Sequence, residues 1–190
     1  RIFQMPRSMW SDFNEELIYE GGGIFDRNLK SIRISKQAKN VFDIEKEFLT
    51  PNELIQSMLK SDVDLIWFGG IGTYIKSETE SHLDAGDPPN NNVRLNASDV
   101  RARVISEGAN LGITQPARIE FELANGHINT DSIDNSAGVN MSDYEVNIKI
   151  LLSEFLAHQF IKSSDRNKLL EKATNQVTQL VLSNNIRQHQ

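Results

Sequence analysis

Apolar and polar residues along the chain follow the pattern of an α/β protein. Thr50 can cap a helix that has Pro51 at its first position, and Glu53 completes a capping box, in which cap and third residue bond each other's backbone N–H groups. A mostly apolar run at 63–68 then has the length of a buried strand, and it ends in a glycine-rich loop at 69–73. A helix, a buried strand and a glycine loop in this order predict part of a parallel sheet flanked by helices.

Two further strands are predicted to end in polar loops. Residues 103–107 contain β-branched residues and run into Gly108 and Asn110, and residues 127–130 form a short strand before a small-residue loop at 131–139. In an open parallel sheet, ligands bind beyond the carboxyl ends of the strands. The glycines at 69–73 could merely connect elements, but together these loops indicate a binding crevice.

The rest of the pattern predicts one more strand, three helices and a long loop. The strand is expected at 31–35, and the helices at 114–124, from Ser142 onward and from about Ser164 to a polar tail at 183–190 that frays. Ser142 can begin a second capping box with Glu145. Residues 77–99 are rich in Asp, Asn, Gly and Pro and predict a mobile surface loop, in which His82 is solvated.

Composition narrows the class of protein. The chain has 190 residues, a net charge of −6 and no cysteine. The acidic balance argues against nucleic acid as the main partner, and the lack of cysteine excludes thiol chemistry and favours a cytoplasmic setting. No apolar run approaches the roughly 18 residues of a membrane span, so we expect no membrane partner. The chain begins at Arg1 without an evident element, so we expect a fragment of a longer protein, forming one domain with a helical appendage.

The candidate chemistry lies in amides rather than in a nucleophile or a metal site. No serine nucleophile with a base, no spaced histidine pair and no carboxylate pair on one short element is present in the sequence. The loops at 69–73, 107–110 and 135–138 offer backbone and side-chain amides, which suit a ribose or a carboxamide. This pattern predicts a bound cofactor that supplies the reactive chemistry, and no metal.

Four segments carry a resemblance to a known family. They are Val-Asp-Leu-Ile-Trp-Phe-Gly-Gly-Ile-Gly-Thr-Tyr at 63–74, Glu-Gly-Ala-Asn-Leu-Gly-Ile-Thr at 107–114, Asn-Thr-Asp-Ser-Ile-Asp-Asn-Ser-Ala-Gly-Val-Asn at 129–140, and Ser-Asp-Tyr-Glu-Val-Asn-Ile-Lys-Ile-Leu-Leu at 142–152. These segments resemble the glutamate dehydrogenases, and most closely the very large NAD-dependent bacterial class. The resemblance covers about residues 1–160 and leaves the final helix largely outside it.

The resemblance implies a cofactor site and a substrate site. In that family the Glu-Gly-Ala-Asn segment lines the nicotinamide-ribose end of the dinucleotide site. The implied NAD-binding residues are Gly69, Gly70, Ile71, Gly72, Glu107, Gly108, Ala109, Asn110 and Asn135. The smaller family members carry a serine, seven positions after an asparagine, that looks like a contact to the substrate's side-chain carboxylate. Asn135 and Ser142 keep this spacing and are the implied substrate-binding residues. Ser136 and Ala137 stand where those enzymes have Ala and Gly, which leaves the loop path open.

The implied activity is oxidative deamination of L-glutamate to 2-oxoglutarate and ammonium, with NAD as hydride acceptor. The catalytic lysines and aspartate of the family are expected upstream of Arg1, so the chain alone should be inactive. We expect a partial Rossmann-like sheet flanked by helices, with residues 1–142 as the later part of the NAD-binding domain, 143–190 as a helical C-terminal region, and a homo-oligomeric parent. The alternatives are another amino-acid dehydrogenase, which would lack a polar partner for a side-chain carboxylate, and a non-catalytic interaction or regulatory domain.

Overall fold

The computed structural model describes residues 8–190, which form two compact units. Arg1, where the sequence begins without an evident element, lies outside the described residues. The first unit comprises the described residues up to Ile66 together with Gly72–Ile105 and Ile113–His127. The second comprises Trp67–Ile71, Ser106–Gly112 and Ile128–Gln190.

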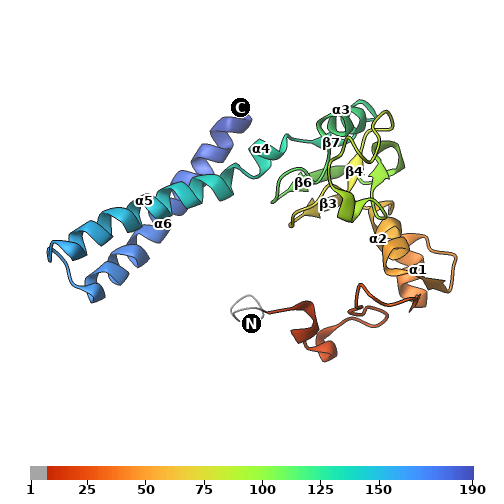
Figure 1. Ribbon diagram of the computed structural model, residues 1–190, viewed down its shortest axis with the longest axis horizontal. Helices are drawn as coiled ribbons and strands as arrows, with labels where there is room; N and C mark the ends of the chain where they lie inside the picture. Colours follow the sequence, from red (N-terminus) through yellow and green to blue (C-terminus); the bar gives the residue numbers. More distant parts are fainter. Residues whose placement is uncertain (1–7) are drawn as a thin grey trace. The chain divides into compact units, whose positions relative to one another are not determined.

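Helices and strands alternate through the first two thirds of the chain, and helices alone follow (Figure 1). The elements are β1 (Ile32–Arg33), α1 (Lys36–Phe42), β2 (Phe48–Leu49), α2 (Pro51–Leu59), β3 (Leu65–Phe68), β4 (Ile75–Lys76), β5 (Leu95–Asn96), β6 (Val104–Glu107), α3 (Gln115–Leu123), β7 (His127–Ile128), α4 (Asp131–Asp134), α5 (Ser136–Ala157) and α6 (Ser163–His189).

A parallel sheet in the order β3-β6-β7 confirms the predicted fold class. The Val104 N–H donates to the Asp64 carbonyl oxygen at 3.0 Å, and the His127 N–H donates to the Arg103 carbonyl oxygen at 2.9 Å. A parallel pair, β4 and β5, and an antiparallel pair, β1 and β2, form separate small sheets. The sheet has three short strands and is flanked by helices, which agrees with the parallel, helix-flanked sheet that the sequence predicts.

Helix α2 begins where the sequence predicts it. The Glu53 N–H donates to Thr50 Oγ1 at 3.3 Å, and the Thr50 N–H donates to Glu53 Oε2 at 2.8 Å, which closes the capping box. The hydrogen bond from the Thr50 backbone, followed by that from the Lys46 ammonium, lowers the pKa of Glu53 to about 2. Helix α3 likewise begins as predicted, with Thr114 as its cap.

The predicted surface loop at 77–99 is wrong for residues 93–97, which contain β5 and buried side chains, whereas residues 78–92 form turns. Val93, Arg94 and Leu95 are at most 5% exposed, and the Leu95 N–H donates to the Tyr74 carbonyl oxygen at 2.9 Å. The apolar run is too short to show an alternating pattern among its polar neighbours. Pairing with β4 is a tertiary effect that overrides the local preference for a loop. His82 is exposed as predicted, although its Nδ1 lies 3.1 Å from Nη1 of Arg94.

The predicted loop at 131–139 is also wrong, since α4 and α5 occupy it. Asn135, the cap between the two helices, itself has helical backbone angles, so the chain passes almost directly from one helix into the next. Ser142 therefore lies in the second turn of α5, and its predicted role as a helix cap is wrong as well. Asn, Ser and Asp favour turns, but they are equally suited to first helical turns, and the local sequence does not separate these two uses.

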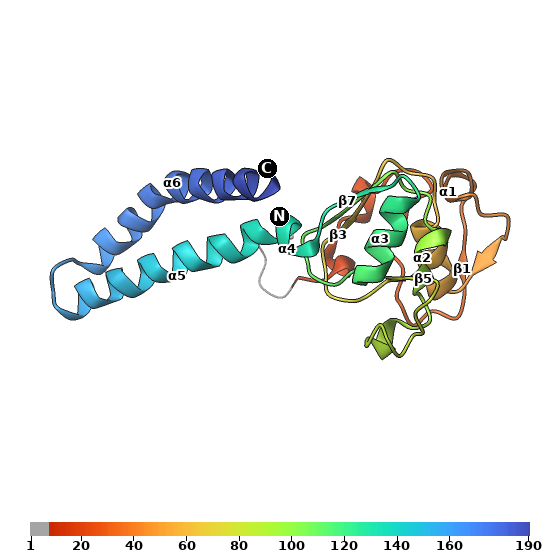
Figure 2. The same cartoon turned by 90° about the horizontal axis from the view of Figure 1, so that it is seen from above.

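Helices α5 and α6 form an antiparallel hairpin (Figures 1 and 2). Gln159 turns the chain with a left-handed φ of 58°, and the rings of Phe155 and Phe160 meet edge to face at 6.0 Å beside it. Helix α6 continues to His189, so the predicted fraying from residue 183 is wrong. The Asn185 amide donates to the Ile133 carbonyl oxygen at 3.0 Å, a tertiary bond that orders this polar end. Among the described helices, none has the length and apolarity that crossing a membrane requires.

Candidate functional site

The loop at 107–112 is closed on itself at the carboxyl end of β6. Glu107 is 1% exposed, and its Oε2 accepts a hydrogen bond from the Gly112 N–H at 2.9 Å. The Gly108 N–H donates to the Phe68 carbonyl oxygen at 2.8 Å, which continues the pairing of β6 with β3. The Leu111 N–H donates to Asp131 Oδ2 at 3.2 Å. Glu107 therefore holds the loop from inside, and its side chain does not line the pocket described below.

Trp67 lies close to the backbone of two predicted cofactor residues. A Cβ atom built at Gly69 would lie 2.3 Å from the Trp67 ring, and one built at Gly108 would lie 2.5 Å from it. A side chain at either position would therefore need the Trp67 ring, which is 62% exposed, to move away. Gly69, Gly70 and Ile71 are exposed, as is Gly108, while Ala109 is half-buried.

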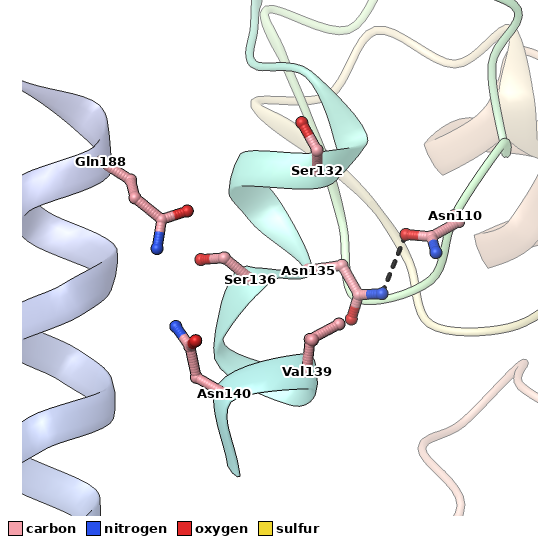
Figure 3. Close-up of a pocket in the computed structure, with 7 residues that line it drawn as sticks. All are labelled: Asn110, Ser132, Asn135, Ser136, Val139, Asn140 and Gln188. Atoms are coloured by element: carbon pink, nitrogen blue, oxygen red, sulfur yellow. Dashed lines mark hydrogen bonds between the residues drawn. The ribbon is translucent and has the colours of Figure 1, made fainter. Parts of the chain in front are cut away.

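The structure brings together two predicted site residues that are 25 positions apart, Asn110 and Asn135. The Asn135 amide nitrogen donates to the Asn110 side-chain oxygen at 2.8 Å (Figure 3). Asn110 comes from the loop after β6 and Asn135 from the junction of α4 and α5. Asp134, at the end of α4, adds a second bond between this junction and the end of β6, because its Oδ2 accepts a hydrogen bond from the Glu107 N–H at 2.9 Å.

These two asparagines form one side of a pocket of about 300 Å³. The lining residues are Asn110, Ser132, Asn135, Ser136, Val139, Asn140 and Gln188. Figure 3 shows Ser136 and Asn140 on the side of α5 that faces α6, with Gln188 opposite them. The lining contains hydroxyls, primary amides and one apolar side chain, and it contains no charged group. Such a surface can bind a neutral polar group, or a carboxylate, through hydrogen bonds.

Five of the pocket residues were not predicted from the sequence, namely Ser132, Ser136, Val139, Asn140 and Gln188. Ser132, Ser136 and Asn140 are spaced four apart, which places them on one face of the α4–α5 segment. This polar stripe was the available signal, but it is visible only once residues 131–140 are read as helix. No local pattern connects Gln188 with the others.

Ser142 lies outside this pocket lining and is exposed. Seven helical positions correspond to about two turns, so Ser142 lies on the same face as Asn135 and roughly 10 Å further along α5. This spacing keeps Ser142 on the side of the helix that carries Asn135, and its role in substrate binding stays a prediction. The expected domain boundary between residues 142 and 143 falls inside α5, and the domain division also stays a prediction.

In the first unit, the buried side chain of Arg94 holds the end of the glycine-rich loop at 69–73. Gly72 has a φ of 132°, a conformation that favours glycine, and it precedes Thr73. The Thr73 N–H donates to Asp87 Oδ2 at 2.7 Å, and Arg94 Nε donates to the Thr73 carbonyl oxygen at 2.8 Å. Hydrogen bonds from the Asn90 side chain, and then from the Thr73 backbone, lower the pKa of Asp87. Both polar groups of the Thr73 backbone are therefore fixed by side chains from the segment that follows.

No cluster of three His, Asp or Glu side chains that could hold a metal ion is present among residues 8–190. The polar groups at the pocket are the amides and hydroxyls already described.

The fold and the pocket define an α/β protein that presents neutral hydrogen-bonding groups beyond the end of a parallel strand, the position at which nucleotide-dependent α/β enzymes bind their cofactors. Residues 1–190 match the family model described as the catalytic domain of bacterial NAD-glutamate dehydrogenase. The chain belongs to this family.

Curated relatives of the chain carry the name NAD-specific glutamate dehydrogenase. The chain is 51% identical to the protein of Halomonas elongata over 190 residues and 52% identical to that of Pseudomonas aeruginosa over 190 residues, with all of this chain covered in both cases. It is 49% identical to the Mycobacterium tuberculosis protein over 191 residues, with 97% of this chain covered. The chain spans about 12% of the length of each of these relatives.

Proposed function

We propose that this chain is part of the catalytic domain of an enzyme that oxidatively deaminates L-glutamate to 2-oxoglutarate and ammonium with NAD. The contact between Asn110 and Asn135 carries the proposal, because it joins a side chain that the family resemblance assigns to the nicotinamide end of the site to one that it assigns to both cofactor and substrate binding. The family match and the relatives' names support this substrate over that of another amino-acid dehydrogenase.

The pocket residues fit the nicotinamide end of a dinucleotide. A carboxamide has both a donor and an acceptor, and Asn110 and Asn135 each provide both on one uncharged wall. NAD would supply the hydride acceptor in the reaction, and this chain would orient it. The loops at Gly69–Ile71 and Gly108–Asn110, which are exposed apart from half-buried Ala109, would give the close approach that a ribose requires, with Gly72 continuing the first of these loops.

The chain's own contribution is binding and orientation rather than proton transfer. No pocket residue is a general acid or base, so the groups that activate water and move protons are expected elsewhere in the parent. We retain a homo-oligomeric parent, a cytoplasmic setting, and the lack of nucleic-acid and membrane partners as parts of this proposal.

The parent protein should reduce NAD in the presence of L-glutamate, and the 190-residue chain by itself should not. Spectrophotometric measurement of NADH formation by both purified proteins, with L-alanine and L-leucine as control substrates, tests this directly. A parent that reduces NAD equally well with the control substrates, or not at all with glutamate, contradicts the proposed activity. NADH formation by the isolated chain would contradict only the expectation that the proton-transfer groups lie elsewhere in the parent.

Ser142→Ala in the parent should raise the KM for glutamate about tenfold and leave the Kd for NAD unchanged, as expected for the loss of a hydrogen bond to a carboxylate. Ser153→Ala is a matched control, since Ser153 is also exposed on α5 and donates to the Lys149 carbonyl oxygen at 2.7 Å. Steady-state kinetics and NAD titration of both variants provide the comparison. Equal KM values for the two variants would remove Ser142 from the substrate site.

A further inference from the structure

Among the residues that line the pocket, one buried side-chain donor is satisfied by no other group of the described chain. The side-chain nitrogen Nδ2 of Asn140 is buried and has no hydrogen-bond partner. Most buried polar atoms in proteins are paired, so an unpaired donor at a pocket points to a ligand acceptor. Figure 3 shows this amide in the space between α5 and α6, near Ser136 and Gln188.

The neighbouring polar groups are already engaged or belong to the same wall. Ser136 Oγ accepts a hydrogen bond from the Asn185 amide at 2.9 Å, and the same amide donates to the Ile133 carbonyl oxygen. Asn135 is bonded to Asn110. These bonds fix the walls on both sides of Asn140, whose own amide nitrogen is buried between them.

We propose that Asn140 is a specificity-determining residue, whose amide donates a hydrogen bond to an oxygen of the molecule bound in this pocket. This inference rests on the proposed function. The pocket volume of about 300 Å³ is at the lower end of the range for small-molecule sites, roughly 300–1,000 Å³, so it takes one end of a ligand rather than a whole dinucleotide. The acceptor is a planar carbonyl-type oxygen, from either the substrate carboxylate or the nicotinamide carboxamide.

Gln188, near the end of α6, also belongs to the proposed binding site. It lines the pocket opposite Asn140, and the Asn185 amide ties the same helix to the start of α5. The final helix is thus a wall of the binding site, although it carries little of the family resemblance that the sequence shows.

The experiment uses the full-length parent with Asn140→Asp and Asn140→Ala. Asn140→Asp is nearly isosteric, which preserves the fold, and it replaces the donor by an acceptor. Asn147→Ala is the matched control, because Asn147 lies two turns further along α5, is exposed, and donates only to its own helix at the Asp143 carbonyl oxygen, at 2.8 Å. The measurements are the KM for glutamate, the Kd for NADH by fluorescence titration, and the Tm.

If the acceptor belongs to the substrate carboxylate, the KM for glutamate should rise about tenfold in Asn140→Ala and further in Asn140→Asp, with the Kd for NADH unchanged. If it belongs to the nicotinamide carboxamide, the Kd for NADH should rise about tenfold in both variants. Either result supports the donor role. Both constants within about twofold of the wild-type values, or a change in Tm alone, would overturn it. A wild-type parent without glutamate-dependent NADH formation would instead defeat the proposed function, which keeps the two failures distinct.

Discussion

Replacing Arg94 with methionine should lower the free energy of unfolding of the first unit by about 3–5 kcal/mol, the usual cost of removing one partner from a buried charged network. The Arg94 side chain is 0% exposed. Besides the Thr73 carbonyl, it donates to the Asp87 carbonyl oxygen at 2.6 Å and to Asn91 Oδ1 at 2.7 Å. Methionine fills similar space but leaves these acceptors unpaired, and it releases the backbone that follows Gly72.

Arg103→Met is the matched control for this prediction. Arg103 pairs with Asp64 at 3.3 Å, but the two side chains are 77% and 91% exposed, so its loss should change stability by no more than about 0.5 kcal/mol. Urea unfolding, with hydrogen exchange followed at residues 72–96, separates the two variants. Similar losses in both would show that the buried network contributes little.

Glu107→Ala should lower the stability of the second unit by about 2–4 kcal/mol and reduce kcat/KM of the parent about a hundredfold. The substitution leaves a cavity at a position that is 1% exposed and removes the acceptor of the Gly112 N–H. The loop that carries Asn110 then loses its internal closure, so the contact with Asn135 is no longer held.

Glu107→Gln tests the same point with less disturbance. Its side-chain oxygen can still accept from the Gly112 N–H, so stability and activity should lie between those of the wild type and Glu107→Ala. Thermal unfolding and steady-state kinetics with NAD as the varied substrate measure both effects. Wild-type behaviour of Glu107→Ala would mean that the loop does not depend on this carboxyl group.

The parts of the fold that the sequence predicts correctly are those decided by neighbouring residues. Thr50, Pro51 and Glu53 specify the start of α2 within four positions, and the apolar run before Gly69 specifies β3. The positions of β5 and of the end of α6 could not be predicted in this way. Both depend on partners far along the chain, as the bond from Leu95 to Tyr74 and that from Asn185 to Ile133 show.

The same distinction between local and distant determinants applies to the candidate site. The resemblance identifies Asn110 and Asn135 as individual residues, but it does not reveal that their side chains bond each other. Asn140 and Gln188 were missed because one depends on the true start of α5 and the other on the return of α6. Local preferences at 131–139 suit a turn as well as a helix, and the choice between them is made by packing.

The bond between Asn185 and Ser136 spans 49 residues, so the pocket is completed only by the last element of this chain. During synthesis, α4, α5 and the loop of Asn110 leave the ribosome before the end of α6 can reach them. The entropy lost in closing so long a loop must then be offset by the pairing of α5 with α6. We therefore expect the hairpin to form first and the pocket to acquire its final wall as a late step of folding.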